Sequence, residues 1–300
     1  MSPNSEPDTP EPFVSVVVPA PADPRHLEQC LRGVLEQNYA EYELVVVRGP
    51  HLSLEFESGT AELRVVEEKD CESLAGLVNS GIGAARGEVV IVLMPNCLPD
   101  GKEWLRGMVK PFQDEDVGAV VGHCRMAEGQ GQSLPARVMD VVGDPETDDG
   151  EEGRELELLS HLCDAYRSDV LSGLSELYSP VIPNPGEAVD LAIRLRSSGH
   201  RIVLSPGAGV SYFDPPETRS LKAVLAKAID YGRADAILGK LWGVDWLGSR
   251  THAVAVLSLS LVPVGLLSLP VGVILAGVFF VLGWFLPLRL PATRWEWPVA

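Results

Sequence analysis

Cysteines, histidines and clustered acids are the side chains of this sequence that could bind a metal or act as nucleophiles. The five cysteines are scattered and never spaced as CxxC, which argues against a zinc site or a disulfide framework and favours a reducing compartment. We interpret Cys97 as a small buried apolar residue rather than a nucleophile. His123 and Cys124 are neighbours on a strand and face opposite sides, so they form a poor ligand pair.

Acidic residues dominate the charge of the chain. Residues 144–157 carry eight acidic side chains, with Pro145, Gly150 and Gly153 among them. We interpret this segment as a solvated loop, and a substitute cation site is the alternative. Over the whole chain, 42 Asp and Glu stand against 24 Lys and Arg, a net charge of −18. A surface of this charge repels phosphate backbones, so we expect no nucleic-acid partner.

Alternating strands and helices must position any site in the first half of the chain. Apolar runs rich in β-branched residues indicate strands, and apolar residues at helical spacing indicate helices. The order βαββαβ predicts an open, mostly parallel α/β sheet, whose ligands bind beyond the carboxyl ends of the strands. The informative residues should therefore follow Val18, Val47 and Leu93. The predicted strands are 13–19, 42–47, 63–67 and 88–93, and the predicted helices are 26–37 and 73–86.

The two ends of the chain have different compositions. Residues 1–12 hold four prolines and no apolar run, which predicts a disordered tail without a signal peptide. Residues 253–288 are 36 positions without a charge, which indicates membrane insertion. One straight helix of that length would be about 54 Å long, so we expect a transmembrane hairpin with its turn near Pro270. Arg250, Arg289 and Arg294 flank it and place both ends in the cytoplasm. Two buried core helices are the alternative.

A third membrane feature precedes the hairpin. Apolar residues recur at helical spacing from Leu221 to Ile229 among charged ones, and Trp242 and Trp246 follow. This pattern predicts an amphipathic helix at the membrane surface, with an ordinary half-buried helix as the alternative. The predicted organisation is a tail (1–12), a globular domain (13–215), an interfacial helix (216–250), a transmembrane hairpin (251–290) and a cytoplasmic tail (291–300).

Six segments, in order, resemble the glycosyltransferase family 2 domain, which has the GT-A fold. The resemblance covers roughly residues 13–240, and a membrane hairpin follows, as in many members that act on lipid-linked acceptors. It implies a GT-A-like open, mostly parallel twisted sheet with flanking helices. The segments are VSVVVP (14–19), CLRGVLEQNY (30–39), YELVVV (42–47), NSGI (79–82) with ARGE (85–88), GEAVDLAIRL (186–195) and GHRIV (199–203).

The resemblance implies transfer of a sugar from a nucleotide diphosphate donor. In the family, Mg²⁺ or Mn²⁺ neutralises the leaving diphosphate and is held by an Asp-x-Asp pair after the fourth strand. The matching stretch here is Leu93-Met94-Pro95-Asn96-Cys97, in which both carboxylates are missing. We therefore predict no metal ligands at these positions.

Three other family positions also differ. The Asp pair that recognises the nucleoside matches Arg48-Gly49, and the often basic residue before Asn79 is Val78. The general base of the Gly-Glu-Asp motif matches Ala188, and an alanine cannot abstract a proton. Loss of a general base alone costs about 10²- to 10⁴-fold in rate, so these changes put activity in question.

Neighbouring acids are the candidate catalytic residues. Glu187 and Asp190 flank Ala188 and could replace the base. Each has a structural alternative: Glu187 as an acid at the start of a helix, and Asp190 as the partner of Arg194 one turn later.

Donor-binding candidates follow from the same resemblance. Arg48 could contact a diphosphate directly, because its guanidinium fork suits phosphate, and a solvated strand-end residue is the alternative. Asn96 offers a neutral amide oxygen. The full set of donor-binding candidates is Pro19, Ala20, Arg48, Asn79 and Asn96.

Two functions remain open at this point. The first is a membrane-anchored glycosyltransferase at the cytoplasmic side of the cell membrane, using a nucleotide-sugar donor and a lipid-linked or cell-envelope glycan acceptor. The second is a catalytically inactive relative that acts as scaffold or partner of an active glycosyltransferase. A transporter is disfavoured, because two chargeless helices offer no polar path.

Overall fold

The structure is a computed structural model that describes residues 11–21, 26–49, 62–68, 73–127, 153–174, 177–184, 186–213 and 221–243. The chain divides into two compact units, Met1–Ala234 and Asp235–Ala300. The predicted hairpin (251–290), the cytoplasmic tail (291–300) and residues 1–10 lie outside the described residues. Among the described helices, none combines the length and apolar composition needed to cross a bilayer.

One mixed sheet forms the centre of the first unit. In the described part of the chain its strand order is β3-β2-β1-β4-β7-β6-β8-β5. The strands are β1 (Val14–Ala20), β2 (Tyr42–Arg48), β3 (Glu62–Glu67), β4 (Val89–Leu93), β5 (Cys97–Pro99), β6 (Val117–Met126), β7 (Cys163–Arg167) and β8 (Arg201–Tyr212). The helices are α1 (Leu27–Leu35), α2 (Leu74–Ala84), α3 (Trp104–Val109), α5 (Ser168–Ser172), α6 (Gly186–Ser197) and α7 (Leu221–Trp242), with a 3₁₀ turn, η1 (Lys110–Gln113).

The predicted βαββαβ order is confirmed, but the sheet is less parallel than expected. Strands β3, β2, β1 and β4 are mutually parallel, as are β6 and β8. Strand β7 runs antiparallel between β4 and β6, and β5 runs antiparallel to β8. The pattern of the first hundred residues carries no information on these later strands, so the predicted parallel sheet describes only the first half.

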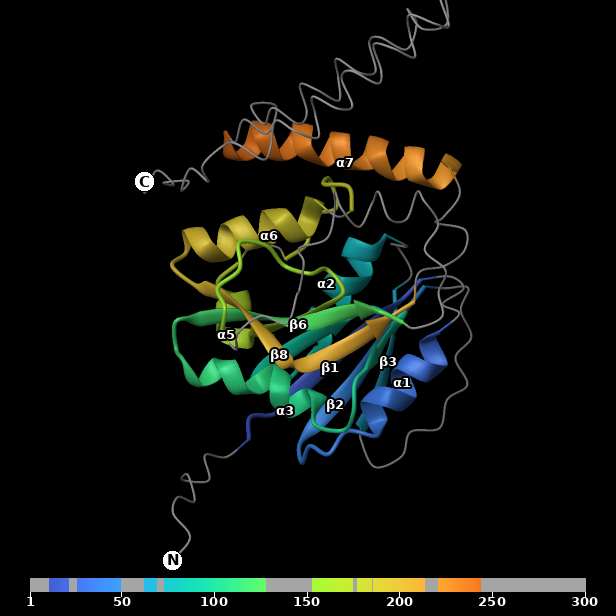
Figure 1. Ribbon diagram of the computed structural model, residues 1–300, viewed down its shortest axis with the longest axis vertical. Coiled ribbons are helices and arrows are strands. Elements are labelled where there is room, and N and C mark those ends of the chain that lie inside the picture. The colour runs from blue at the N-terminus through green and yellow to red at the C-terminus, as the bar shows by residue number, and fades with distance from the viewer. Residues whose placement is uncertain are drawn as a thin grey trace, which may run out of the picture. The chain divides into compact units, whose positions relative to one another are not determined.

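The direction of the strand order reverses at β1. The chain runs from β1 outward to β2 and β3, and then returns to place β4 on the other side of β1. Because such crossovers are right-handed, helices on the two sides of a reversal fall on opposite faces. Figure 1 shows this arrangement, with α2 and α6 on one face of the sheet and α1 and α3 on the other.

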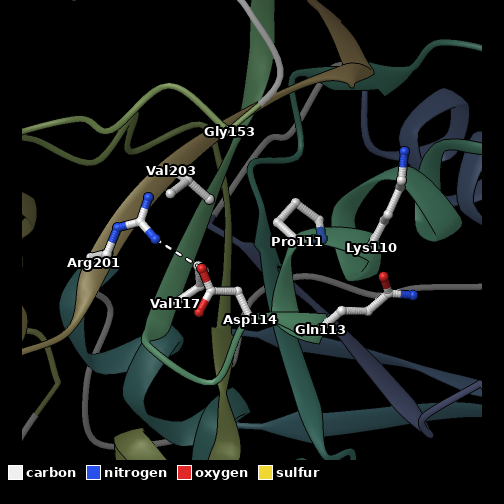
Figure 2. Close-up of a pocket in the computed structure, with 8 residues that line it drawn as sticks. All are labelled: Lys110, Pro111, Gln113, Asp114, Val117, Gly153, Arg201 and Val203. Atoms are coloured by element: carbon white, nitrogen blue, oxygen red, sulfur yellow. Dashed lines mark hydrogen bonds and ion pairs between the residues drawn. The ribbon is translucent and has the colours of Figure 1, made fainter.

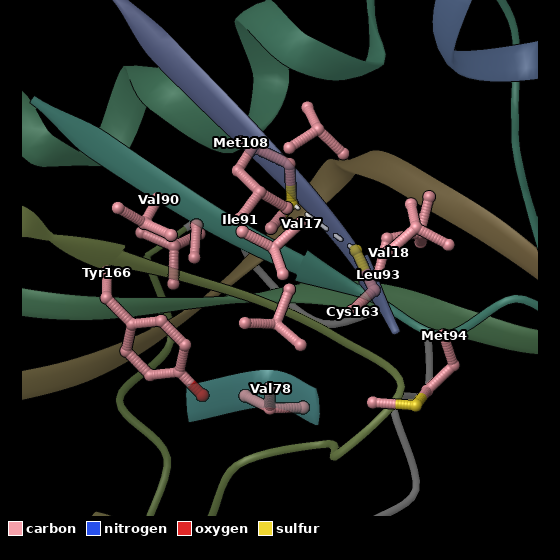
Figure 3. Packing of buried hydrophobic residues seen from close by; sticks show 14 of the residues in the cluster. Val17, Val18, Val78, Val90, Ile91, Leu93, Met94, Met108, Cys163 and Tyr166 are labelled. Atoms are coloured by element: carbon pink, nitrogen blue, oxygen red, sulfur yellow. Dashed lines mark hydrogen bonds between the residues drawn. The ribbon is translucent and has the colours of Figure 1, made fainter. Parts of the chain in front are cut away.

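Valine-rich strands make the core. All residues of β1 and β4 are buried, as is the middle of β2, as expected for strands covered on both faces. Helix α2 approaches these strands closely at Gly81, where a Cβ would lie 2.7 Å from Cγ2 of Val47 and would also collide with Val17. Figure 3 shows the packing of Val17, Val78 and their neighbours.

A buried carboxylate joins the first three strands. The Glu43 side chain is fully buried and accepts hydrogen bonds from the Ser15 hydroxyl (2.6 Å), Arg86 Nη2 (2.8 Å) and Arg64 Nη1 (3.1 Å). Burial opposes ionisation, but the hydrogen bonds from Ser15, Arg86 and Arg64 together hold the pKa of Glu43 below its usual range. This network fixes the strands whose opposite ends carry the candidate site.

Two predicted segments are partly described. Residues 153–156, the end of the predicted acidic loop, run along β8: the Leu156 amide donates to the Ile202 carbonyl (2.8 Å), and Leu156 is buried. This part of the segment is therefore attached to the sheet. The interfacial segment 216–250 contains α7, whose Ile229 and Trp242 are exposed and whose Ala234 is buried.

Candidate active site

The carboxyl ends of β1, β2 and β4 meet at one edge of the sheet. Ala20, the last residue of β1, pairs with Arg48, the last residue of β2. On the other side of β1, the chain leaving β4 at Met94 donates its amide to the Leu162 carbonyl (2.9 Å), just before antiparallel β7. The turn before β7 therefore lies at the same edge, beside the point where strand order reverses. Ligands of open α/β sheets bind at this place.

Arg48 is held by a neighbouring strand. Its Nη2 lies 2.9 Å from Oε2 of Glu67 at the end of β3, and its side chain is 24% exposed. The guanidinium is at the predicted edge, but part of its charge is compensated. Pro19 and Ala20 are buried and offer mainly backbone there.

The residues after β4 do not suit a hard cation. Met94 is buried and carries a soft thioether, and Figure 3 shows it at the margin of the apolar cluster next to Leu93. The side-chain Nδ2 of Asn96 donates to the backbone carbonyl of Phe213 (2.9 Å), and the backbone amide of Phe213 donates to the backbone carbonyl of Asn96. Among the described residues, no group of three His, Cys, Asp or Glu could hold a metal. The described residues directly after β4 therefore offer no carboxylate to Mg²⁺ or Mn²⁺.

The side-chain amide of Asn79 binds backbone groups. Its Nδ2 donates to the Tyr178 carbonyl (2.7 Å), and its Oδ1 accepts from the Tyr178 amide (3.0 Å). The side chain thus ties α2 to the segment that precedes α6.

Glu187 is a buried carboxyl in the first turn of α6. Its side chain is 2% exposed, and Oε2 has no hydrogen-bond partner in the described part of the chain. Burial, opposed by hydrogen bonds from its own backbone and from Asn184, raises the pKa of Glu187 to about 7. A carboxyl of this kind can accept a proton near neutral pH, which makes Glu187 the candidate general base. The structural alternative, an acid at the start of a helix, also fits, because Glu187 lies in the first turn of α6 and its own backbone amide donates to the carboxyl.

Asp190 has the predicted structural role. Its Oδ2 accepts from Arg194 Nε at 2.9 Å, one helical turn later. The pair is mostly buried, and Arg194 also donates to the Leu177 carbonyl. The i,i+4 interpretation is therefore confirmed.

His161 adjoins Glu187 and was not singled out by the sequence. Its Nε2 lies 4.0 Å from Glu187 Oε1 and hydrogen-bonds with Asn184 Nδ2, and its ring centroid is 5.8 Å from that of Tyr178. Its φ of 64° is the one positive value at a non-glycine among the described residues, a conformation that costs roughly 1–2 kcal/mol. Buried Asp164 holds the turn by accepting from the His161 amide (2.8 Å).

A sequence signal for this cluster existed but was weak. Ser160, His161 and Asp164 are polar residues immediately before and within the buried stretch that forms β7. Their spacing matches no metal or nucleophile motif, and the side-chain partners of His161, Asn184 and Glu187, lie more than twenty residues away from it.

A pocket of about 260 Å³ lies elsewhere, at the opposite edge of the sheet. It is formed where β6 begins at Val117 and β8 begins at Arg201, and Figure 2 shows Arg201 paired with Asp114 across it (2.8 Å). Because α/β sheets bind ligands at the carboxyl ends of their strands, we do not assign the reaction to this pocket.

Cys97 is buried, as the sequence predicts. Cys97 is 1% exposed, and burial raises the pKa of its thiol well above the ordinary value. Cys163 is likewise buried, with its sulfur 3.9 Å from that of Met108 (Figure 3). Thiolates are the nucleophilic form, so neither residue is a nucleophile.

The fold is an α/β sheet whose strand order reverses at β1, and sheets of this kind bind ligands at such a reversal. A sequence model of glycosyl transferase family 2 matches residues 15–167. Since the match covers half of the chain, the chain belongs to this family. The predicted family and the GT-A-like fold are thereby confirmed.

Individual proteins are similar over different shares of the chain. Glycosyltransferase AglE of Haloferax volcanii is 25% identical over 134 residues, which span 42% of this chain and 44% of AglE. The mannosyltransferase PcManGT of Pyrobaculum calidifontis, solved with GDP-Man and Mn²⁺, has a TM-score of 0.55 at 20% identity. The match covers 94% of this chain and 83% of the PcManGT chain. Staphylococcus aureus TarS 1–349 with UDP-GlcNAc has a TM-score of 0.54 at 17% identity, covering 80% and 74%. At these identities the two structures are evidence for the fold alone.

Proposed function

We propose that this chain is a membrane-anchored glycosyltransferase that moves a sugar from a nucleotide-sugar donor to a lipid-linked or cell-envelope glycan acceptor. Membership of the family and the reversal of strand order at β1 support donor binding at the edge formed by Ala20, Arg48 and Met94. The observation that carries the proposal is the buried Glu187 carboxyl beside this edge. It stands next to Ala188, where the family base is missing, and can take its place.

The proposed chemistry uses no divalent cation on the residues after β4, because Met94 and Asn96 are not ligands for one. Arg48, with the backbone at the ends of β1 and β4, is the group we propose for contact with the diphosphate. Guanidinium binds phosphate oxygens in a bidentate manner, which offsets part of the charge on the leaving group.

Membrane anchoring rests on composition. We propose the domain limits predicted above, with the globular domain (13–215) at the cytoplasmic side of the cell membrane and the hairpin (251–290) as the anchor. The 36 chargeless positions at 253–288 and the flanking arginines support this placement.

A second candidate function is an inactive relative that binds an active glycosyltransferase. The observation that favours it is the set of replaced family positions at this edge: Arg48-Gly49, Val78, Met94, Asn96 and Ala188. Nucleotide binding separates the two functions.

The test is calorimetric titration of the full chain in detergent with GDP-mannose and UDP-GlcNAc, in EDTA and in Mn²⁺. We expect binding of one of these donors that is the same in both conditions. A matched variant, Met94→Asp with Asn96→Asp, should bind more tightly in Mn²⁺ than in EDTA, because it restores carboxylates at the edge. Absence of donor binding by the wild type would contradict the first function and favour the second.

A further inference from the structure

We infer that His161 is a positioning residue of the transfer reaction: its imidazole holds the Glu187 carboxyl in place and controls when that carboxyl accepts a proton from the acceptor hydroxyl. The inference rests on the proposed function for its catalytic part. The pairing of the two side chains can be tested without turnover.

The backbone at His161 indicates that the imidazole itself is required. Glycine adopts a φ of 64° without strain, and the other positive-φ residues of the described chain are glycines. The turn is closed by Asp164, which accepts from the amides of Ser160 (2.9 Å) and His161 (2.8 Å) and from the Ser160 hydroxyl (2.8 Å). None of these bonds uses the imidazole, so a glycine would make the same turn at lower cost. The strained histidine is therefore explained by what its ring contacts.

The ring contacts the side chain of the candidate base. Nε2 faces Glu187 Oε1 at 4.0 Å, and Asn184 hydrogen-bonds with Nε2 and with the Glu187 carboxyl. The His161 side chain is 13% exposed and that of Glu187 is 2% exposed, so both lie largely out of water. Because the two groups lie this close together and largely out of water, we expect the charge of one to change the proton affinity of the other.

Other ionisable groups around the pair are already engaged. Asp164 on β7 is bound to the Ser160–His161 turn, and the Tyr178 hydroxyl lies 3.5 Å from that of Tyr166. Asp190 on the same helix as Glu187 binds Arg194. Helix α7 packs against the start of α6, where a Cβ on Gly186 would collide with Ala234. The charged residues Asp230 and Arg233 of α7 pair with each other (3.4 Å). Within the part of the chain that the structure describes, Glu187 is thus the carboxyl that the imidazole faces.

The proposed step balances as follows. The acceptor hydroxyl gives its proton to Glu187 Oε2, the oxygen that has no hydrogen-bond partner in the described chain. The acceptor oxygen forms a bond to the anomeric carbon of the donor, the bond from that carbon to the diphosphate breaks, and its electron pair leaves with the nucleoside diphosphate. Nδ2 of Asn184 donates to Nε2 of neutral His161 and to the Glu187 carboxyl, and these bonds favour the carboxylate before the step. Without the imidazole to orient Asn184, Glu187 would keep its proton up to a higher pH and be inactive below that pH.

The experiment measures nucleoside diphosphate release by the full chain in detergent from pH 5.5 to 9, with the donor that binds. His161→Asn retains tolerance of the left-handed backbone, and His161→Gly removes the strain. For both variants we expect the acidic limb of the kcat profile to move up by about one pH unit, with about a 10-fold loss of kcat at pH 6.5 and an unchanged KM for donor. Added imidazole should partly restore His161→Gly. An unshifted limb in both variants, or a loss confined to KM, would overturn the inference.

A titration independent of turnover separates this inference from the proposed function. The imidazole resonances of His161 are followed by NMR in the wild type and in Glu187→Gln. Loss of the carboxylate should lower the apparent pKa of His161 by about one unit. Equal pKa values in the two proteins would refute the pairing, whatever the donor result. If the wild type binds no donor but the apparent pKa of His161 still falls in Glu187→Gln, the proposed function is contradicted and the pairing of the two side chains is supported.

Discussion

Replacement of Glu187 by glutamine should stabilise the protein, and the gain should depend on pH. Burial raises the pKa of this carboxyl from 4.5 to about 7. The unfolded chain therefore releases the proton near pH 4.5 and the folded protein only near pH 7. Between these two pH values the folded state binds more protons than the unfolded chain. The free energy of unfolding therefore falls as pH rises through this window, and above pH 7 the destabilisation by the charged Glu187 stays constant.

The size of the effect follows from the same two values. A rise from 4.5 to about 7 corresponds to about 3 kcal/mol of destabilisation by the charged carboxyl at pH 8.5. Glutamine has nearly the same shape and does not ionise. Glu187→Gln should therefore raise the free energy of unfolding by up to about 3 kcal/mol at pH 8.5 and change it little at pH 4.5.

The assay is urea unfolding of the full chain in detergent, followed by tryptophan fluorescence at both pH values. Buried Asp164, whose pKa burial raises to about 6, contributes a similar dependence to both proteins and cancels in the difference. Glu28→Gln is the control, because Glu28 is 68% exposed and pairs with Arg32 on the surface, and we expect a change within about 0.5 kcal/mol. A gain for Glu187→Gln that is the same at both pH values, or a loss, would refute a desolvated carboxyl at this position.

Three further predictions concern the scaffold and the anchor. Gly81→Ala should lower the free energy of unfolding by about 1–3 kcal/mol, because the new Cβ collides with Val17 and Val47. The control is Gly83→Ala on the same helix, where a Cβ would meet no atom within 4 Å, and it should be neutral or stabilising in the same urea assay. Glu43→Gln should lower the free energy of unfolding by about 2–3 kcal/mol at pH 7, because the buried carboxylate loses its charge in the hydrogen bonds from Arg64 and Arg86. Thermal unfolding should show this difference shrinking as pH falls and the wild-type carboxylate is protonated, and a difference independent of pH would argue against the network. The full chain should resist carbonate extraction from membranes and lose this resistance when residues 251–300 are deleted, and a full chain extracted by carbonate would count against the hairpin.

The sequence predicted those features that depend on local patterns. The valine runs of β1, β2 and β4 form buried strands, Cys97 is buried, and Asp190 pairs with Arg194 one turn away. These outcomes need only period, propensity and short-range spacing.

The features it did not predict depend on contacts between distant residues. The antiparallel β7 is stabilised by partners that no spacing identifies. The turn at His161 is closed locally by Asp164, but it meets Glu187 only in the folded chain. The amides of Asn79 and Asn96, predicted as donor contacts, bind backbone groups 99 and 117 residues away. Their donor-binding role stays a prediction.

Release of nucleoside diphosphate from GDP-mannose or UDP-GlcNAc by the wild type and by Glu187→Gln, measured in EDTA, tests the central claim most directly. The claim is that Glu187 replaces the missing base at an edge whose residues do not hold a cation. We predict that the wild type turns over one of these donors in the chelator and that Glu187→Gln is slower by about 10²- to 10⁴-fold. Equal rates for the two proteins, or a wild-type rate that requires Mn²⁺, would contradict it.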